Sequence, residues 1–439
     1  MTLVTTDPTN ELSQFGDRPA GRLAITRSPL RHALQGAWAV SDQALFALSN
    51  FALNLLLARW MSPRDYGAFG VAFSIFLLLG VLHTAFFTEP MLVHGPSDRY
   101  RHKFGGYLKV LVGGHFLFSL AAALTLLAAS IGLGRLGQPA LSASIMGLAF
   151  MSPLVFLLWL GRRACYVLLL PRLAASGGIL YMCILLGGVA VLSRQQSLSP
   201  VAAFGVMGAG SLVSSVWLLH RVLALGGAHE SVARASVAQD HFEYGRWAAP
   251  SSVLYWATGS APLLLLPLWG GYEAVAMLKA LLNLIMPALH ALSALSVLLV
   301  PNLVRFKGAS ELRGLMKLAL VAFLTAGAAY ALPLMVFGQS ILHWAYVGKY
   351  DAAARWLPLL ALLPILSGVS YVFGGALRAA NRPDLVFRAQ AGSAATALIL
   401  AVPLLRHGDT GGAVLLLLIA IGVDAGLKCL AGRSAISAG

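Results

Sequence analysis

Charged side chains are scarce in this chain. Aspartate, glutamate, lysine and arginine make up only 11% of its 439 residues, whereas 58% are hydrophobic. A soluble protein of this length could not cover its surface with so few charges. Apolar runs of about 18 to 28 residues recur along nearly the whole chain, and each is long enough to cross a hydrocarbon layer of roughly 30 Å. The sequence therefore indicates a polytopic membrane protein.

Cysteine is rare as well, and the three cysteines lack the spacing of metal ligands: Cys165, Cys183 and Cys429. We interpret them as packing residues and predict no metal and no cofactor. The sequence has no glycine-rich loop of the Walker type, which excludes direct use of ATP. Its net charge of +15 is scattered over short connections and is not grouped with aromatic residues, so nucleic-acid binding is not expected.

The apolar runs predict an all-α fold of about twelve transmembrane helices. The spans are expected, to within a few residues, at 34–58, 66–93, 104–132, 141–161, 173–193, 199–224, 246–269, 273–301, 313–338, 355–377, 385–405 and 411–431. Twelve crossings put both chain ends on one side of the membrane. Placing that side in the cytoplasm assigns it 23 of the 31 lysines and arginines, as the positive-inside rule requires.

The chain divides into two similar halves. We expect a cytoplasmic disordered tail over 1–33, a six-helix lobe over 34–224, a cytoplasmic linker over 225–245, a second six-helix lobe over 246–431 and a tail over 432–439. A shift of 209 residues lays "LLLARWMSPRDYGAFGVAFS" over "LLLPLWGGYEAVAMLKALLN". An even number of spans per half gives parallel repeats, which are related by an axis along the membrane normal.

The corner between the first two spans carries a family resemblance. "LLARWMSP" followed by "DYGAFGVAFS", with "TEP" at 88–90, resembles the polysaccharide and O-antigen flippases of the multidrug/oligosaccharidyl-lipid/polysaccharide exporter (MOP) superfamily. The resemblance implies alternating access and movement of an undecaprenyl-pyrophosphate-linked glycan across a bacterial inner membrane. It also implies contact with membrane lipid, and a polysaccharide polymerase and export machinery as partners. Lipid II flippases carry more arginines in the first two spans than this chain does.

Polar residues recur at helical spacing inside two spans, as expected of helices that line a wet cavity. In the first span they are Gln43, Asn50 and Asn54, and in the eighth they are Lys279, Asn283, His290 and Ser293, with Met286 on the same face. We predict that both stripes line the substrate cavity. For the eighth-span stripe, helix–helix contacts and snorkelling of Lys279 to the interface are the alternatives.

Charged and titratable residues inside the spans suggest further roles. Lys279 is the candidate phosphate contact, joined by Arg59, whose alternative role is an interfacial anchor beside Trp60. Three groups are candidates for ion coupling, with structural pairing as the alternative: Asp42, His83 and Glu89. His115 is read as a helix–helix hydrogen-bonding residue. Asp424 and Lys428 have the i, i+4 spacing of an internal ion pair.

These observations predict a flippase without catalytic residues or enzymatic activity, serving exopolysaccharide or O-antigen (lipopolysaccharide) synthesis. Two alternatives remain open. A cation-coupled drug antiporter of the same superfamily would need a carboxylate-rich cavity, and mid-membrane acids are few here. A membrane glycan polymerase or ligase would need a large outer loop with catalytic histidines, whereas the longest outer connection here is Gly338 to Ala354.

Overall fold

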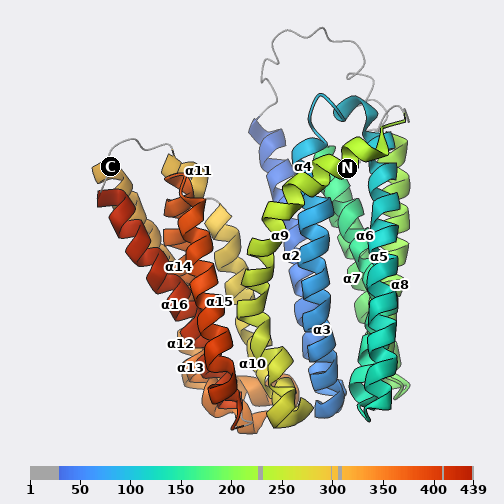
Figure 1. Ribbon diagram of the computed structural model, residues 1–439. Coiled ribbons are helices and arrows are strands. Elements are labelled where there is room, and N and C mark those ends of the chain that lie inside the picture. Colours follow the sequence, from blue (N-terminus) through green and yellow to red (C-terminus); the bar gives the residue numbers. More distant parts are fainter. Residues whose placement is uncertain (1–28, 226–230, 298, 305–308, 408–409, 438–439) are drawn as a thin grey trace, which may run out of the picture.

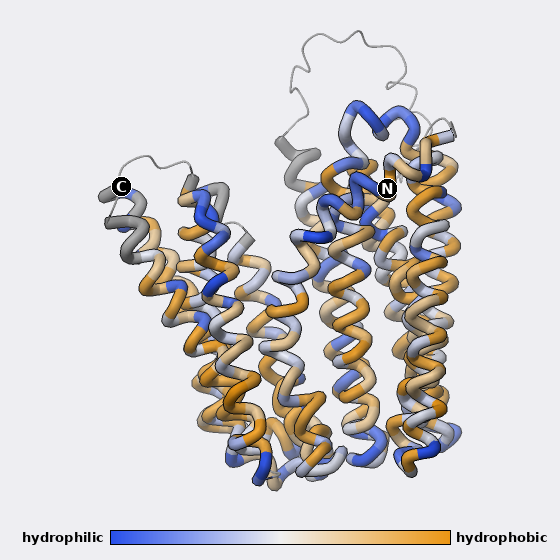
Figure 2. Tube along the Cα trace, in the orientation of Figure 1, coloured by the Kyte–Doolittle hydropathy of each residue, from blue (hydrophilic) through white to orange (hydrophobic). Residues whose placement is uncertain are grey.

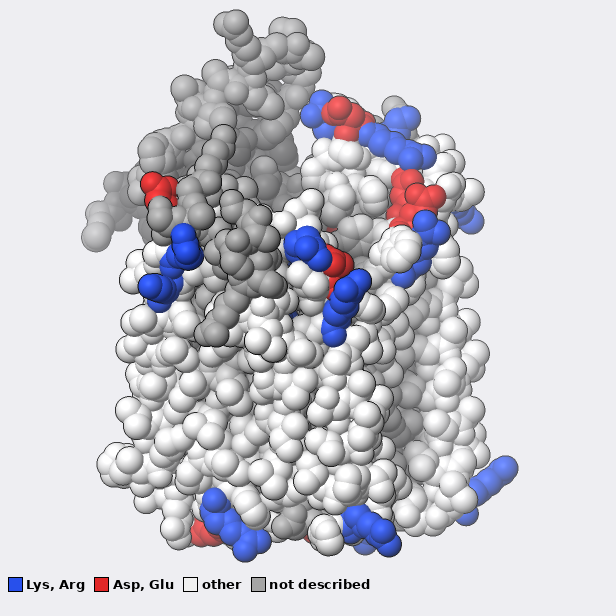
Figure 3. Space-filling view, turned by 60° about the vertical axis from the view of Figure 1, so that its left-hand side comes forward, with Lys and Arg blue, Asp and Glu red and all other residues white. Residues whose placement is uncertain are grey.

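The computed structural model describes residues 29–225, 231–297, 299–304, 309–407 and 410–437, and every regular element in these ranges is helical. The all-α prediction is therefore confirmed. The helices form two groups, an N-lobe from α2 to α8 and a C-lobe from α9 to α16 (Figure 1). Their polar and charged residues gather toward the two ends of the bundle, with a predominantly apolar band between them (Figures 2 and 3).

The N-lobe contains seven helices: α2 (Pro29–Trp60), α3 (Pro63–His83), α4 (Glu89–His94), α5 (Phe104–Arg135), α6 (Pro139–Val167), α7 (Pro171–Arg194) and α8 (Pro200–Leu225). A π-helical turn, η1 (Thr84–Thr88), joins α3 to α4, and a 3-10 turn, η2 (Arg101–Lys103), precedes α5. Four of the long helices follow tight turns and begin at proline, because proline fits the first helical position without loss of a hydrogen bond. At α3, the hydroxyl of Ser62 also caps the backbone N–H of Asp65.

The C-lobe contains α9 (Arg234–Leu265), α10 (Pro267–Val297), α11 (Leu299–Val304), α12 (Ala309–Tyr346), the 3-10 turn η3 (Asp351–Trp356), α13 (Leu357–Leu360), α14 (Leu363–Ala379), α15 (Pro383–Leu405) and α16 (Thr410–Ser437). The start of α10 is broken at Gly271, whose φ of 68° lies in the left-handed region. The predicted eighth span therefore becomes regular helix just after this break.

Eleven helical segments among the described residues are long and apolar enough to cross a membrane. The twelfth crossing is α9, which runs through the same layer (Figure 1) but begins with a charged segment. That segment, from Arg234, was predicted as linker. It is helical, and no glycine or proline interrupts it from Arg234 to Tyr244. Residues 226–230 of the predicted linker, 1–28 of the first tail and 438–439 of the last lie outside the described residues, whereas 29–33 already belong to α2.

Apart from α9, which also contacts the N-lobe elsewhere, the two lobes meet at one end of the bundle. We call it the corner end, because the α2–α3 corner lies there; α2 begins and α16 finishes at the opposite, terminal end (Figure 1). One cluster of buried hydrophobic residues continues from the N-lobe into the corner half of the C-lobe. A second, separate cluster fills the terminal half of the C-lobe, around Leu303 and Phe373. The ribbons of the lobes correspondingly diverge toward the terminal end.

Candidate functional site

The contact between the lobes, which we call the seam, is formed mainly by α3 against α10. Two glycines of α3 allow the close approach. A Cβ atom on Gly67 would overlap the backbone carbonyl of Tyr272, and one on Gly70 would lie 2.8 Å from Cδ of Lys279. Small residues are what let two helices pack closely within a membrane. The seam thus depends on positions that cannot hold a larger side chain.

Lys279 lies inside this seam with only 8% of its surface exposed. Its Nζ faces three aromatic rings of α3, at 4.5 Å from the ring centroid of Phe73, 5.5 Å from that of Phe69 and 5.9 Å from that of Tyr66. A cation over ring faces is stabilised electrostatically. Within the described part of the chain, no oxygen atom accepts a hydrogen bond from Nζ. The lysine is therefore a buried cation without an anionic partner, not one that snorkels to the interface.

A second lysine binds the N-lobe at the corner end. Nζ of Lys349 donates hydrogen bonds to the carbonyl oxygens of Arg59 (2.6 Å) and Met61 (3.0 Å), and the hydroxyl of Tyr350 donates to that of Ala58 (3.3 Å). These carbonyls stand at the C-terminal end of α2, where the helix dipole is negative. Lys349 thus caps a helix of the other lobe.

The turn that carries Lys349 joins α12 to η3. Its backbone is left-handed at Val347 (φ 55°) and Gly348 (φ 78°). His343 and Asp351, on either side of the turn, are 2.7 Å apart through Nδ1 and Oδ2. This contact between His343 and Asp351 closes the turn, from which Lys349 and Tyr350 point toward α2.

Asn283, one α-helical turn beyond Lys279, also lies in the seam. It is buried, and its Nδ2 lies 3.4 Å from the hydroxyl of Tyr346 and 3.5 Å from the carbonyl of Phe51 in α2. The Tyr346 hydroxyl donates in turn to the carbonyl of Ala280. Of the predicted eighth-span stripe, Lys279 and Asn283 therefore contact the N-lobe, whereas His290 is exposed and Ser293 is half-buried.

The predicted first-span stripe does not converge on one point. Asn50 and Asn54 donate to the carbonyls one turn back in their own helix, those of Phe46 and Asn50, at 3.0 and 2.8 Å. Oδ1 of Asn54 is buried and has no hydrogen-bond partner among the described residues. Gln43 is exposed in the terminal half of α2, 3.5 Å from the hydroxyl of Tyr166. The cavity-lining role of all three remains a prediction.

Asp42 is fully buried and ion-paired within the N-lobe. Arg162 of α6 approaches it with Nη2 at 2.7 Å from Oδ2 and Nε at 3.2 Å from Oδ1, and the Tyr166 hydroxyl donates to Oδ2 at 2.6 Å. The guanidinium also lies over the ring of Phe46, 4.4 Å from its centroid. This arrangement corresponds to the structural alternative for Asp42, although it does not test ion coupling.

The other two candidates for ion coupling differ in burial. His83 is buried against His115 of α5, with 3.1 Å between Nε2 and Nδ1. Nδ1 of His83 has no hydrogen-bond partner among the described residues. Glu89 is half-buried at the start of α4. The three candidates for ion coupling thus differ in burial and in their partners.

The C-lobe holds a buried polar cluster of its own. Nζ of Lys428 lies 2.7 Å from Oδ2 of Asp424, and Ser370 of α14 donates to the same oxygen at 2.5 Å. The structure contains the ion pair that the i, i+4 spacing predicts. Asp42 and Asp424 are thus both neutralised by cations.

At the terminal end, the first part of α9 is fastened to the N-lobe. Asp240 accepts from Arg99 (3.0 and 3.1 Å) and from Tyr100 (2.5 Å). Nδ1 of His241 lies 2.7 Å from the carbonyl of Phe86, and Nε2 lies 2.7 Å from the hydroxyl of Tyr107. Because a carbonyl can only accept, Nδ1 carries the proton and Nε2 accepts from Tyr107. We call the segment 234–245 the strap.

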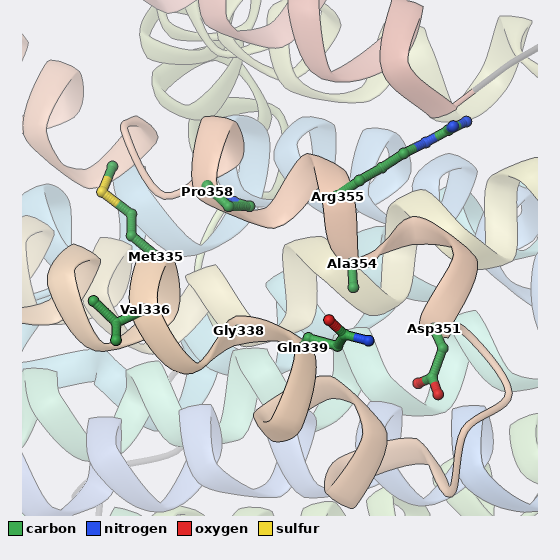
Figure 4. A pocket seen from close by; sticks show the side chains of 8 residues that line it. All are labelled: Met335, Val336, Gly338, Gln339, Asp351, Ala354, Arg355 and Pro358. Atoms are coloured by element: carbon green, nitrogen blue, oxygen red, sulfur yellow. The ribbon is translucent and has the colours of Figure 1, made fainter.

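A pocket of about 400 Å³ opens beside the Lys349 turn, between α12, η3 and α13. Gln339 points across it toward Ala354, whereas Arg355 extends away (Figure 4). None of the predicted site residues lines this pocket. The candidate site is therefore the seam, not the pocket.

Sequence reasoning missed the partners of Lys279. The rings of Tyr66, Phe69 and Phe73 recur at i, i+3 and i+7, a spacing that places them on one face of α3. That signal was visible in the sequence, but which helix meets this face was not. Lys349 and Tyr350 carried no signal beyond their place in an outer loop.

No protein-family model matches the chain, and no curated protein matches it either. Solved structures do. The lipid II flippase MurJ in an inward closed conformation superimposes with a TM-score of 0.72 at 12% identity, covering 91% of this chain and 87% of that one. An inward-facing multidrug resistance MATE family transporter gives 0.70 at 13% identity, covering 91% and 98%. A MOP superfamily transporter from Pyrococcus furiosus gives 0.67 at 12%, covering 91% and 96%.

The structure defines a two-lobed, multi-pass helical membrane protein. The chain has the fold of MOP superfamily transporters, as the resemblance in its sequence predicted. Because the identities are 12–13%, the substrate is a separate question.

Proposed function

We propose that the protein is a flippase that moves an undecaprenyl-pyrophosphate-linked oligosaccharide across the bacterial inner membrane for exopolysaccharide or O-antigen synthesis. The observation that carries the proposal is the buried, unpaired cation of Lys279 between two lobes. A cation inside a membrane protein is costly and needs a function or a partner. A pyrophosphate group is a ligand that would supply the missing charge.

The proposed mechanism is alternating access by rocking of the lobes. With both termini in the cytoplasm, as the positive-inside rule favours, the closed corner end faces outward and the diverging terminal end faces the cytoplasm. The lipid-linked glycan would enter from the terminal end, with its sugars in the polar space between the lobes and its lipid tail in the bilayer. Separation of α3 from α10 would then release it outward.

The predicted polar residues take roles in this proposal. Gln43, Asn50, Asn54, His290 and Ser293 would contact the glycan, and Asn283 would link its binding to the seam. Among the candidates for coupling, His83 keeps a buried, unpaired nitrogen that can exchange a proton, whereas Asp42 is already paired. A polysaccharide polymerase and export machinery would take the product.

A cation-coupled drug antiporter is the second candidate, because MATE family transporters share the fold. Such a transporter needs free negative charge to bind a cation. Here two buried acids, Asp42 and Asp424, are neutralised by Arg162 and Lys428, and the unpaired buried charge at the seam is positive. These contacts favour an anionic substrate. A glycan polymerase or ligase is disfavoured, since the outer connection from Gly338 to Ala354 forms only the end of α12 and the start of η3.

The test is export of surface polysaccharide in a deletion strain that carries wild type, Lys279→Met, Asn283→Leu or Lys317→Met. Lys317 is an exposed lysine of α12 and serves as the matched control. We expect Lys279→Met and Asn283→Leu to abolish export and accumulate lipid-linked glycan at normal membrane abundance, and Lys317→Met to be silent. If the deletion itself leaves surface polysaccharide unchanged, the proposed substrate class is wrong.

A further inference from the structure

The C-lobe side of the seam presents hydrogen-bond donors and positive charge, and the N-lobe side supplies what satisfies them. Lys279, Lys349 and Tyr350 belong to the C-lobe, and all three direct their polar atoms at the N-lobe. Their partners are ring faces of α3 and the carbonyl oxygens of Ala58, Arg59 and Met61. No N-lobe carboxylate takes part among the contacts of the described residues.

The end of α2 acts here as an anion would. Its last carbonyls have no intrahelical donors and carry the negative pole of the helix dipole. Lys349 binds two of them at once. The Tyr66 ring lies near both Lys279 and Tyr350: its centroid is 5.9 Å from Nζ of Lys279 and 6.3 Å from the ring centroid of Tyr350. The donors of the C-lobe thus surround one small region of the N-lobe.

When α2 and α3 move away, this region is vacated and both lysines lose their partners together. We infer that the C-lobe side of the seam is a diphosphate-binding site, formed by Lys279, Lys349 and Tyr350, that α2 and α3 occupy in the closed state. This inference rests on the proposed function for the source of the ligand, the pyrophosphate of a lipid-linked glycan. It adds an exit-side site to that function, with Lys349 and Tyr350 as new members.

The site couples binding to conformation. A diphosphate binds only after the seam has separated, so it stabilises the open seam by its differential affinity for the two states. By the same linkage, opening the seam raises the affinity for diphosphate. The pyrophosphate group therefore meets Lys279 on the way out, not when the substrate first docks.

The experiment uses a variant that opens the seam without touching the three donors. In Gly67→Val, the new side chain overlaps the carbonyl of Tyr272 and separates α3 from α10. Gly113→Ala, where an added Cβ meets nothing within 4 Å, is the matched control. Binding of inorganic pyrophosphate to the full-length protein in detergent is measured by calorimetry, with sulfate as a second probe. Gly67→Ala provides a milder opening if the valine variant does not fold.

We expect pyrophosphate to bind the Gly67→Val protein at least tenfold more tightly than wild type or Gly113→Ala. In that background, Lys279→Met or Lys349→Met weakens binding at least tenfold, and Lys349→Arg retains it. Equal affinity of the open and closed proteins for pyrophosphate would overturn the inference. So would lysine variants that bind pyrophosphate as tightly as the Gly67→Val protein does. So would sulfate binding as tight as that of pyrophosphate. Failure of the proposed function is distinguishable, because the site would then bind pyrophosphate while the deletion strain exports polysaccharide normally.

Discussion

Gly70 and Lys279 stand at equivalent positions of the two sequence halves, 209 residues apart, and they contact each other across the seam. Equivalent positions meet when they lie close to the axis that relates two repeats. One half has no side chain there and the other has a long one, so the lysine extends over the glycine onto the aromatic face of α3. The two positions that the 209-residue shift aligns thus lie together in the seam.

Replacement of Gly67 should shift the protein toward an open seam. Even Gly67→Ala brings a Cβ into contact with the carbonyl of Tyr272, and backbone cannot yield as a flexible side chain can. Spin labels at Arg64 and Ala352, both exposed at the corner end, report the separation of the lobes. The distance distribution should move to longer values in Gly67→Ala and further in Gly67→Val. Unchanged distributions in both variants would mean that the seam tolerates the added atoms.

Loss of the cap on α2 should weaken the closed seam. Lys349→Met removes a charged donor from two carbonyls at the end of α2, and hydrogen bonds to charged groups contribute about 1.5–3 kcal/mol in proteins. Because the side chain is partly exposed, we expect an effect near the lower limit. The same pair of spin labels should show a larger open population in Lys349→Met than in wild type, and Lys349→Arg should restore closure. Equal populations in all three proteins would show that Lys349 has no role in closure.

The buried ion pair of the N-lobe should matter chiefly for stability. Removing one partner leaves an uncompensated charge, at a cost of about 3–5 kcal/mol, whereas removing both costs less. Asp42→Leu and Arg162→Met should each lower the thermal unfolding temperature in detergent more than the double variant does. If Asp42 instead serves ion coupling, Asp42→Asn would abolish transport without lowering the unfolding temperature.

The strap should loosen in acid. Burial lowers the pKa of His241 to about 4, from an ordinary value of 6.5. The neutral ring is therefore the bound form, and its stabilisation is present above pH 6.5 and is lost as the pH falls toward 4, by about 3 kcal/mol in total. The titratable neighbours of His241 are Tyr107, whose hydroxyl donates to it, and Asp240 and His94.

Spin labels at Asp98 and Ala238, both exposed, can follow this release. Their separation should lengthen and broaden between pH 7 and pH 4.5 in wild type. His241→Gln cannot titrate in this range, so its distances should not change with pH. A pH response that persists in His241→Gln would assign the effect to another group.

The helices were predictable because membrane spans leave a strong signal: length and hydropathy alone fix where a chain can cross. The start of α9 was not, since the polar segment from Arg234 reads as a loop until Asp240 and His241 are seen to bind the N-lobe. The two buried ion pairs also differ in whether the sequence could predict them. Asp424 and Lys428 share one helix and were predicted from their spacing, whereas Arg162 comes to Asp42 from α6 through tertiary packing.

The seam itself shows where sequence reasoning stops. Lys279 and Asn283 were found by helical periodicity, and both lie between the lobes. The same periodicity included His290, which is exposed two turns further along α10. Helical spacing shows which residues share one face of a helix, but not how much of that face a neighbouring helix covers. Which helix covers each part of that face depends on contacts between residues more than two hundred positions apart.

Reconstitution into vesicles would show whether this protein moves a lipid-linked glycan between leaflets. Proteoliposomes would carry undecaprenyl-pyrophosphate-linked oligosaccharide with a fluorophore on the glycan. A reductant that cannot cross the membrane would bleach only the fluorophores on the outer leaflet. With wild-type protein or Lys317→Met we expect bleaching to continue past the outer-leaflet fraction, and Lys279→Met to slow this second phase by roughly tenfold or more. Bleaching that stops at the outer-leaflet fraction with wild-type protein, as in protein-free vesicles, would contradict the account.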